Sequence, residues 1–89
     1  MRKMWTDRAW GNYLFWQTQD KKTLKKVNLL IKDIERSPYE GLGKPEPLLH
    51  DLSGWWSYRI DEKNRLIFRL RDRNLELHSC KSHYEISLV

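Results

Sequence analysis

The chain has 89 residues and carries 17 Lys and Arg against 12 Asp and Glu, a formal net charge of +5. We expect a single domain spanning residues 1–89, and the positive charge favours a polyanionic partner. The one cysteine, Cys80, excludes an intramolecular disulfide, and polar residues interrupt every apolar run of the N-terminus, so we expect a cytoplasmic protein without a signal peptide or a membrane span.

The first third of the chain predicts a short strand and two helices. Residues 2–5 are a candidate edge strand. Thr6 or Asp7 can cap a first helix, whose spacing predicts one buried face formed by Trp10, Tyr13 and Leu14.

A second helix is predicted to begin after Asp20. Its apolar residues recur at spacings of three and four, and lysines occupy the other faces. Pro38 disfavours helical geometry at Ser37, so the helix should end there. The apolar positions are Leu24, Val27, Leu30, Ile31 and Ile34.

The segment 37–52 has no clear periodicity and is the first place to look for function. Beyond it, residues 55–60, 65–70 and 75–84 alternate as strands do, with short polar connections that suit two antiparallel hairpins. The resulting order is β, α, α, β, β, β. It predicts an α+β domain in which two N-terminal helices pack on one face of an antiparallel sheet.

Alternation in the strand 65–70 predicts which of its residues face the helices. Leu66, Phe68 and Leu70 should face them, which turns Arg65, Ile67 and Arg69 to the opposite face.

In the strand 55–60, Trp56, Tyr58 and Ile60 suit the buried face. Ser57 and Arg59 then lie beside Arg65 if the hairpin loop has an odd number of residues or a bulge.

The last strand needs an irregularity. Leu75 and Leu77 fit the buried face, but the same parity would also bury Lys81 and His83. A bulge near Ser79, or an end at which the strand frees its side chains, would resolve the conflict.

The exposed sheet face and the neighbouring loop therefore combine cations with one carboxylate. Arginine forks bind phosphate bidentately, and Trp55 and Tyr84 could stack on unpaired bases.

Cleaving RNA without a metal requires a base for the 2′-hydroxyl, a cation for the phosphate and an acid for the departing oxygen. Glu46, an Arg and His83 could supply these three groups. The expected cations and loop residues are Lys44, His50, Arg59, Arg65, Arg69 and Lys81.

Two plainer interpretations of the same residues stay open. The Lys and Arg side chains could simply solvate the outer face of a small sheet. His78, Cys80 and His83 lie close in sequence, but without a fourth ligand at a familiar zinc spacing a metal site is disfavoured. Cys80 fits better as a small core residue.

Several motifs together resemble the YoeB/Txe toxins of bacterial type II toxin–antitoxin pairs, within the RelE/ParE superfamily. They are the run Pro38-Tyr39-Glu40-Gly41-Leu42-Gly43-Lys44-Pro45-Glu46-Pro47-Leu48 with His50, Leu52-Ser53-Gly54 and Trp56-Ser57; then Arg59-Ile60 and Asn64-Arg65-Leu66; and the ending Cys80-Lys81-Ser82-His83-Tyr84. The resemblance covers nearly the whole chain, from Trp5 to Tyr84.

The resemblance implies a RelE-like fold and a ribosome-dependent mRNA endonuclease that cuts in the A site without a metal or other cofactor. Glu46 would be the general base, Arg65 the phosphate-stabilising cation, His83 the general acid and Tyr84 a residue that orients the substrate. Arg59 and His50 match positions expected to touch RNA. The resemblance also implies a homodimer and a YefM/Axe-like antitoxin that covers the site.

Two departures from the family pattern concern the edges of this site. Leu49 stands where a basic residue is expected before His50, and residues 85–89 extend beyond the usual His-Tyr ending. Rival functions are a gyrase-inhibiting toxin of the same superfamily and a nonenzymatic module that binds nucleic acid through its basic face.

Overall fold

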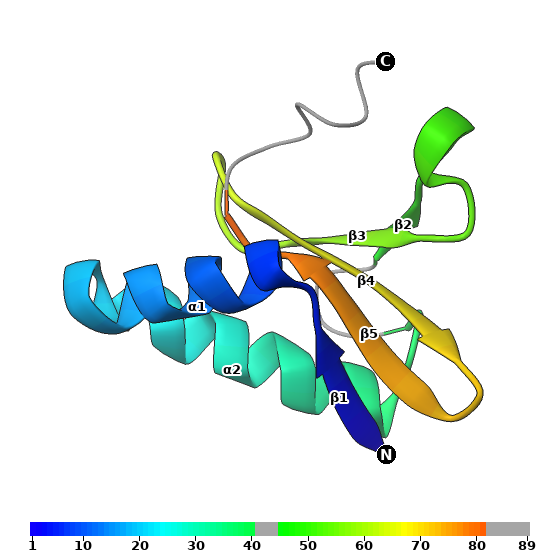
Figure 1. Ribbon diagram of the computed structural model, residues 1–89, viewed down its shortest axis with the longest axis horizontal. Helices are drawn as coiled ribbons and strands as arrows, with labels where there is room; N and C mark the ends of the chain where they lie inside the picture. Colours follow the sequence, from blue (N-terminus) through cyan, green and yellow to red (C-terminus); the bar gives the residue numbers. More distant parts are fainter. Residues whose placement is uncertain (41–44, 82–89) are drawn as a thin grey trace.

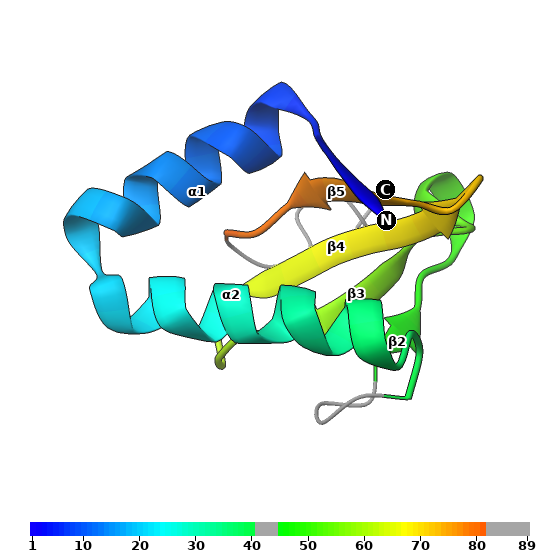
Figure 2. The ribbon, with the colours of Figure 1, turned by 90° about the horizontal axis from the view of Figure 1, so that it is seen from below.

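The computed structural model describes residues 1–40 and 45–81 (Figure 1). One sheet with the strand order β1-β5-β4-β3-β2 packs on one side against the two helices (Figure 2). This arrangement confirms the predicted α+β class. The elements in chain order are β1 (Arg2–Trp5), α1 (Asp7–Gln19), α2 (Lys21–Arg36), β2 (Glu46–Pro47), the 3-10 turn η1 (His50–Leu52), β3 (Trp56–Arg59), β4 (Arg65–Arg71) and β5 (Asn74–Ser79).

Helix α1 begins where the sequence predicted but buries a different face. The Thr6 hydroxyl accepts a hydrogen bond from the Ala9 amide at 3.0 Å. Ala9 and Trp16 are buried, whereas Trp10 and Leu14 are 47% and 43% exposed, so the predicted face is wrong for these two. The small Ala9 lets the helix approach the sheet closely, which brings Trp16 within reach of β5; larger residues at the predicted positions would hold the helix away.

Helix α2 matches its prediction at both ends. The Asp20 carboxylate accepts hydrogen bonds from the Lys22 and Thr23 amides, both at 3.1 Å, and the amide of Ser37 closes the last turn on the Asp33 carbonyl at 2.8 Å. Of the predicted apolar stripe, Leu24 is partly buried and the other four residues are buried. An amphipathic helix held in this way is stabilised mainly by burying one face.

The sheet is mixed, which corrects the expectation that it is entirely antiparallel. β2-β3, β3-β4 and β4-β5 are antiparallel, but β1 pairs with β5 in parallel. Because both helices lie between β1 and the rest of the sheet in the chain, no hairpin turn imposes antiparallel pairing on β1. The two-residue strand β2 was not predicted, since it is too short to show alternation.

The predicted bulge lies one residue before Ser79. Ile67 pairs with Ser79, whereas the next residue, Phe68, pairs with Leu77, so His78 is the extra residue of β5. The bulge changes the strand's parity: Leu75 and Leu77 face the helices before it, and Cys80 rejoins the core after it.

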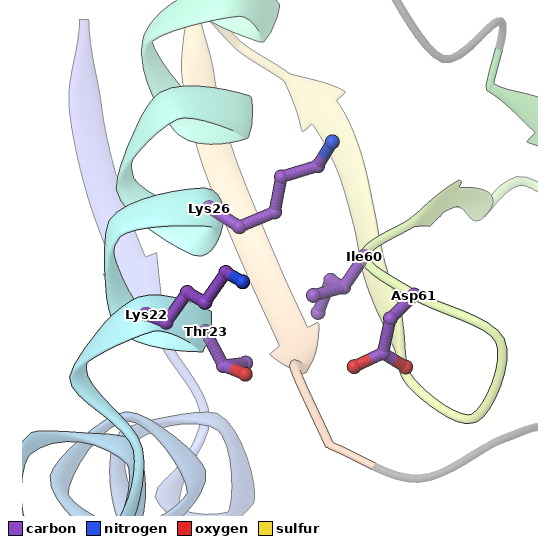
Figure 3. Close-up of a pocket in the computed structure, with 5 residues that line it drawn as sticks. All are labelled: Lys22, Thr23, Lys26, Ile60 and Asp61. Atoms are coloured by element: carbon purple, nitrogen blue, oxygen red, sulfur yellow. The ribbon is translucent and has the colours of Figure 1, made fainter.

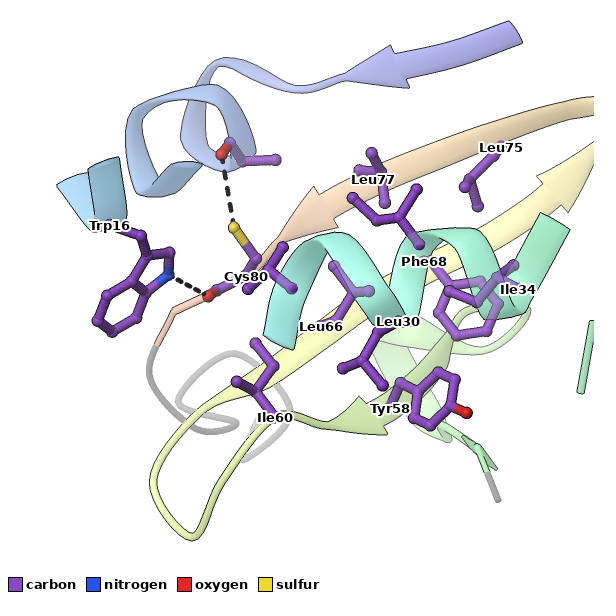
Figure 4. Close-up of a cluster of buried hydrophobic side chains, with 13 residues drawn as sticks. Trp16, Leu30, Ile34, Tyr58, Ile60, Leu66, Phe68, Leu75, Leu77 and Cys80 are labelled. Carbon is purple, nitrogen blue, oxygen red and sulfur yellow. Dashed lines mark hydrogen bonds between the residues drawn. The ribbon is translucent and has the colours of Figure 1, made fainter. Parts of the chain in front are cut away.

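The core lies between the helices and the sheet (Figure 4). Tyr58, Leu66 and Phe68 project from β3 and β4 toward Leu30 and Ile34 of α2. The prediction that these strand residues face the helices is confirmed. Among residues 1–40 and 45–81, no helix has the length and apolar character needed to cross a bilayer.

One buried polar contact ties α2 to β3. The Tyr58 hydroxyl donates a hydrogen bond to the Asp33 carboxylate, and Arg36 pairs with the other carboxylate oxygen at 2.6 Å. Asp33 is 4% exposed, so its charge depends on these partners.

Candidate active site on the open face

We call the sheet face opposite the helices the open face. Cross-strand pairing sets Glu46 beside Ser57 and Ser57 beside Ile67, which places all three side chains on one row across β2, β3 and β4. Ser79 continues the row on β5. The next row toward the β3-β4 turn begins with Arg59 and Arg65. Glu46 is thus held on the same surface as the two arginines.

Glu46 is fixed by its flanking prolines and by pairing with β3. Pro45 is buried and Pro47 pairs with Trp56, while the Leu48 amide donates to the Trp55 carbonyl at 2.9 Å. The carboxylate-bearing residue itself is exposed. Rigid backbone on both sides and an exposed side chain suit a group that must meet a substrate.

Arg59 and Arg65 are direct cross-strand partners, as the alternation predicted. Five residues separate them, so the odd-numbered loop that this placement required is present. The Asp61 carboxylate holds the turn by accepting hydrogen bonds from the Lys63 and Asn64 amides at 2.8 and 2.7 Å.

The two arginines differ in exposure. The Arg59 side chain is 55% exposed and lies 3.8 Å from Glu62, whereas Arg65 is half-buried. A long, exposed Arg59 can follow an RNA backbone, while the more enclosed Arg65 presents its charge from a less hydrated position, where electrostatic interactions are stronger.

Arg69 faces the same side, as predicted, but it has internal partners. Its Nε donates to Glu76 at 2.6 Å, and its guanidinium lies 4.2 Å from the ring centroid of Trp55. The hydrogen bond from Arg69, helped by the charge of Arg71, holds the pKa of the Glu76 carboxyl below its ordinary value despite partial burial. Arg69 therefore helps to build the surface on which any ligand would rest.

Sequence reasoning missed Glu76 as the partner of these arginines. The short connection between β4 and β5 could have revealed this pairing. Its two residues, Asp72 and Arg73, have positive φ values of 54° and 64°, as the turn of a two-residue β-hairpin requires. Counting back from such a turn pairs position 69 with position 76.

The remaining predicted residues lie around the rim or outside the described ranges. His50 is exposed and has a φ of 59° at the start of η1, a left-handed conformation that is uncommon for a non-glycine residue. Lys81 follows β5, and its Nζ lies 4.7 Å from the ring centroid of Phe15 on α1. Lys44, His83 and Tyr84 lie outside residues 1–40 and 45–81.

His78 and Cys80 do not share a site. The ring of His78 packs edge-on against Trp55 on the open face, at 5.1 Å between centroids, whereas Cys80 is buried in the core, as predicted. Burial raises the pKa of the Cys80 thiol to about 12, so the sulfur stays protonated. Within the described part of the chain, no three His, Cys, Asp or Glu residues are grouped closely enough to hold a metal.

The fold is that of the RelE-like toxins. The family model for the YoeB-like toxin of bacterial type II toxin–antitoxin systems matches residues 5–84. The chain belongs to this family of toxins.

Individual relatives agree with this assignment. Toxin YoeB of Escherichia coli K12 is 50% identical over 84 residues, which cover 94% of this chain and all of that protein. The YoeB/ParE toxin of Agrobacterium tumefaciens superposes with a TM-score of 0.92 at 42% identity, covering 94% of this chain and all of the other. Staphylococcus aureus YoeB, solved as a dimer, has a TM-score of 0.88 at 39% identity and covers 94% and 98%; in its complex with YefM the values are 0.87 and 38% at the same coverage.

Proposed function

We propose that this YoeB-family toxin is an mRNA endonuclease that acts on translating ribosomes and cuts the message in the A site. The observation that carries the proposal is the open face itself: Glu46 and Arg65 project from strands separated only by β3. The axes of those strands lie about 10 Å apart. Two long side chains that converge across this gap can reach one phosphodiester.

The chemistry follows from the roles that these groups can fill. Glu46 removes the proton of the 2′-hydroxyl, whose oxygen then attacks the adjacent phosphorus. Arg65 stabilises the charge that develops on the phosphate oxygens, and an acid donates a proton to the 5′-oxygen as the P–O bond breaks. The products are a 2′,3′-cyclic phosphate, which water can open to a 3′-phosphate, and a 5′-hydroxyl. These steps call for no metal or organic cofactor.

His83 is the proposed acid and Tyr84 the residue that orients the substrate. Ser79 pairs with Ile67, so β5 runs toward the end of β4 that carries Arg65. Lys81 is two residues beyond Ser79, and the chain spans at most about 7 Å in two further residues. The direction of β5 therefore supports His83, which follows Lys81 by two residues in the sequence, as the proposed acid.

His78 is a weak candidate for the general acid. Burial, aided by the charges of Arg8 and Arg69, lowers the pKa of the His78 imidazole below its ordinary value. A lower pKa leaves less of the protonated form at neutral pH. This supports the choice of His83 over the histidine that the sheet itself carries.

The mRNA surface would include the cations around this site. We propose that Arg59, His50, Lys44, Lys81 and Arg69 contribute to RNA binding. Arg59 is the best placed of the described residues, because it is exposed beside Arg65. Arg69 contributes through the Trp55 surface that it supports.

Helix α2 supplies a separate surface for ribosomal RNA. Its exposed lysines are Lys21, Lys22, Lys25, Lys26 and Lys32, and among the described residues none of them has a carboxylate within ion-pair distance. Lys22 and Lys26 line a hollow of about 280 Å³ with Thr23, Ile60 and Asp61 (Figure 3). Cations without local partners suit a polyanion whose binding releases counterions. Such binding would position the message and supply part of the rate enhancement.

The partners proposed for the intact system are a YefM/Axe-like antitoxin and a second copy of the toxin. The S. aureus relative has been solved with YefM and as a dimer. This chain exposes apolar side chains on α1, including Trp10, Leu14 and Phe15, which could be buried in such assemblies. We expect the toxin to act in the cytoplasm, where its ribosomal target is found.

The test is to add the purified protein to translating ribosomes and map the new mRNA ends. Wild type should cut within A-site codons, and Glu46→Ala and His83→Gln should each cut far more slowly. Unchanged cutting by His83→Gln would remove the acid assignment. Inhibition of DNA supercoiling without mRNA cleavage would favour a gyrase-inhibiting toxin, and RNA binding without either activity would leave a nonenzymatic module.

A further inference from the structure

A second hollow lies on the open face, away from Glu46 and Arg65. This cavity of about 200 Å³ is lined by Met4, Trp5, Thr6, Trp55, Arg71 and Glu76. We call it the Trp55 pocket. Its residues come from β1, β4 and β5, with Thr6 at the N-cap of α1 and Trp55 just before β3, so several elements and not one loop build it.

Trp55 is held in place before any ligand binds. The Arg69 guanidinium lies 4.2 Å from its ring centroid, and the His78 ring meets it edge-on at 74°. Its backbone amide donates to the Leu52 carbonyl at 3.0 Å, and its carbonyl accepts from the Leu48 amide. A ring fixed in this way loses little entropy when a flat group stacks on it.

The polar side of the pocket has a defined charge state. Glu76 accepts hydrogen bonds from Arg69 and from Arg71, whose Nε lies at 3.1 Å, so the carboxylate stays ionised at neutral pH. The Arg71 side chain is 59% exposed. Among the described residues, only its Nε is engaged, which leaves the terminal amino groups as hydrogen-bond donors.

These features fit a nucleobase better than a bare anion. A π-surface and the apolar wall of Met4 favour a flat, weakly polar group, and the Glu76 carboxylate repels a free phosphate. A base offers a π-face for Trp55 and ring-nitrogen or carbonyl acceptors for Arg71.

We propose that the Trp55 pocket binds one unstacked base of the mRNA, outside the dinucleotide that is cut. Arg71 lies four residues from Ile67 along β4, about 13 Å from the row that carries Glu46. The bound base is therefore a neighbour of the cleaved bond along the same open face. This inference rests on the proposed function for its RNA, but it concerns binding and not the chemical step.

The test uses ribosomes programmed with a message that carries a 2′-deoxy nucleotide at the mapped cleavage site, so that no cut can occur. The fluorescent base 2-aminopurine replaces each flanking nucleotide in turn. Stacking on an indole quenches this fluorophore, so saturating wild-type toxin should quench it at one flanking position. Trp55→Leu should abolish that quenching, and Trp55→Tyr, which keeps a flat ring, should preserve most of it.

Affinity for the RNA gives a second readout. Loss of one stacking contact should weaken binding about 5- to 100-fold for Trp55→Leu. Arg71→Ala should weaken the quenching signal at the same position. Arg2→Ala is the matched control, because it removes one exposed positive charge from the neighbouring strand without altering the pocket lining, and it should leave the signal unchanged.

The outcomes separate this proposal from the proposed function. If wild type cuts an unmodified message but quenches no position, or if Trp55→Leu quenches as wild type does, the pocket assignment is wrong and the nuclease stands. Quenching without any cutting of an unmodified message would support the pocket and reject the nuclease. If Trp55→Leu weakens antitoxin binding but leaves the RNA signals intact, the pocket serves the antitoxin and this proposal fails.

Discussion

The two faces of the sheet use the same strands for different purposes. On the helix face, Tyr58, Leu66 and Phe68 are fully buried and pack against α2. On the open face, the alternate positions of those strands carry Arg59, Arg65 and Arg69. The residues of the helix face are constrained because they must fill the core. The charged residues of the open face are not needed for the core, so they are available for binding and chemistry.

The largest effect should come from an open-face substitution that leaves the fold intact. Glu46→Gln keeps the shape of an exposed side chain but removes the base, so mRNA cleavage on ribosomes should fall about 10²- to 10⁴-fold. The free energy of unfolding, measured in urea, should change by less than about 0.5 kcal/mol. A variant that loses stability instead would show that Glu46 is structural.

The helix face should give the opposite result. Phe68→Ala removes a fully buried ring, and the free energy of unfolding should fall by about 3–5 kcal/mol. Urea denaturation followed by tryptophan fluorescence measures the loss. A drop no larger than that of an exposed substitution such as Leu49→Ala would contradict the packing described for this face.

A smaller effect is expected where the helix face carries a polar contact. Tyr58→Phe deletes the hydroxyl that donates to the buried Asp33 carboxylate, at a cost of about 1–3 kcal/mol in unfolding free energy. Cleavage per folded molecule should be unchanged, since the hydroxyl points away from the open face. Reduced cleavage at full stability would place Tyr58 in the active site.

The pH dependence of stability sharpens the contrast further. The pKa of Glu76 lies below its ordinary value of 4.5 in the folded chain, so its ion pairs stabilise the fold above that value, and the stabilisation is lost as the pH falls through the folded pKa. Glu76→Gln should therefore lower stability at pH 7 by about 1 kcal/mol or less. The difference should vanish at low pH. A constant difference from pH 7 to pH 2 would mean that the charge is not responsible.

The smallest effect on stability should come from α2. Lys22→Gln and Lys26→Gln alter exposed side chains and should change unfolding free energy by less than about 0.5 kcal/mol. If these lysines contact ribosomal RNA, the double variant should bind ribosomes more weakly, with a shallower dependence of affinity on salt. Thr18→Gln is a neutral control on α1. An unchanged salt dependence would leave the lysines as solvated surface.

The parts of the fold that the sequence predicted were those with strong local signals. Asp20 and Pro38 delimit α2, and the alternation from Arg65 onward identified both faces of β4. The buried face of α1 was missed because large aromatic side chains were weighed above a small one: Ala9 is 0% exposed, whereas Trp10 is 47% exposed.

The sequence could predict those parts of the site that depend on the alternation of side chains between the two faces of the sheet. The pairing of Arg59 with Arg65 followed from alternation and an odd loop. The pairing of Arg69 with Glu76 was missed although it could have been counted back from the turn between β4 and β5. The position of Trp55 over Arg69 could not be predicted, because it depends on a contact between segments that only the folded sheet brings together. The roles of His83 and Tyr84 remain predictions from the family resemblance.

In the proposed reaction, the 2′-oxygen of the message attacks the neighbouring phosphate. The most direct measurement compares toxin-treated ribosomes that carry an all-ribose message with ribosomes that carry a single 2′-deoxy nucleotide on the 5′ side of the mapped cut. We expect a 5′ fragment that ends in a 2′,3′-cyclic phosphate or a 3′-phosphate from the all-ribose message, and no cut at the deoxy position. Efficient cutting at the deoxy position would contradict the proposed reaction.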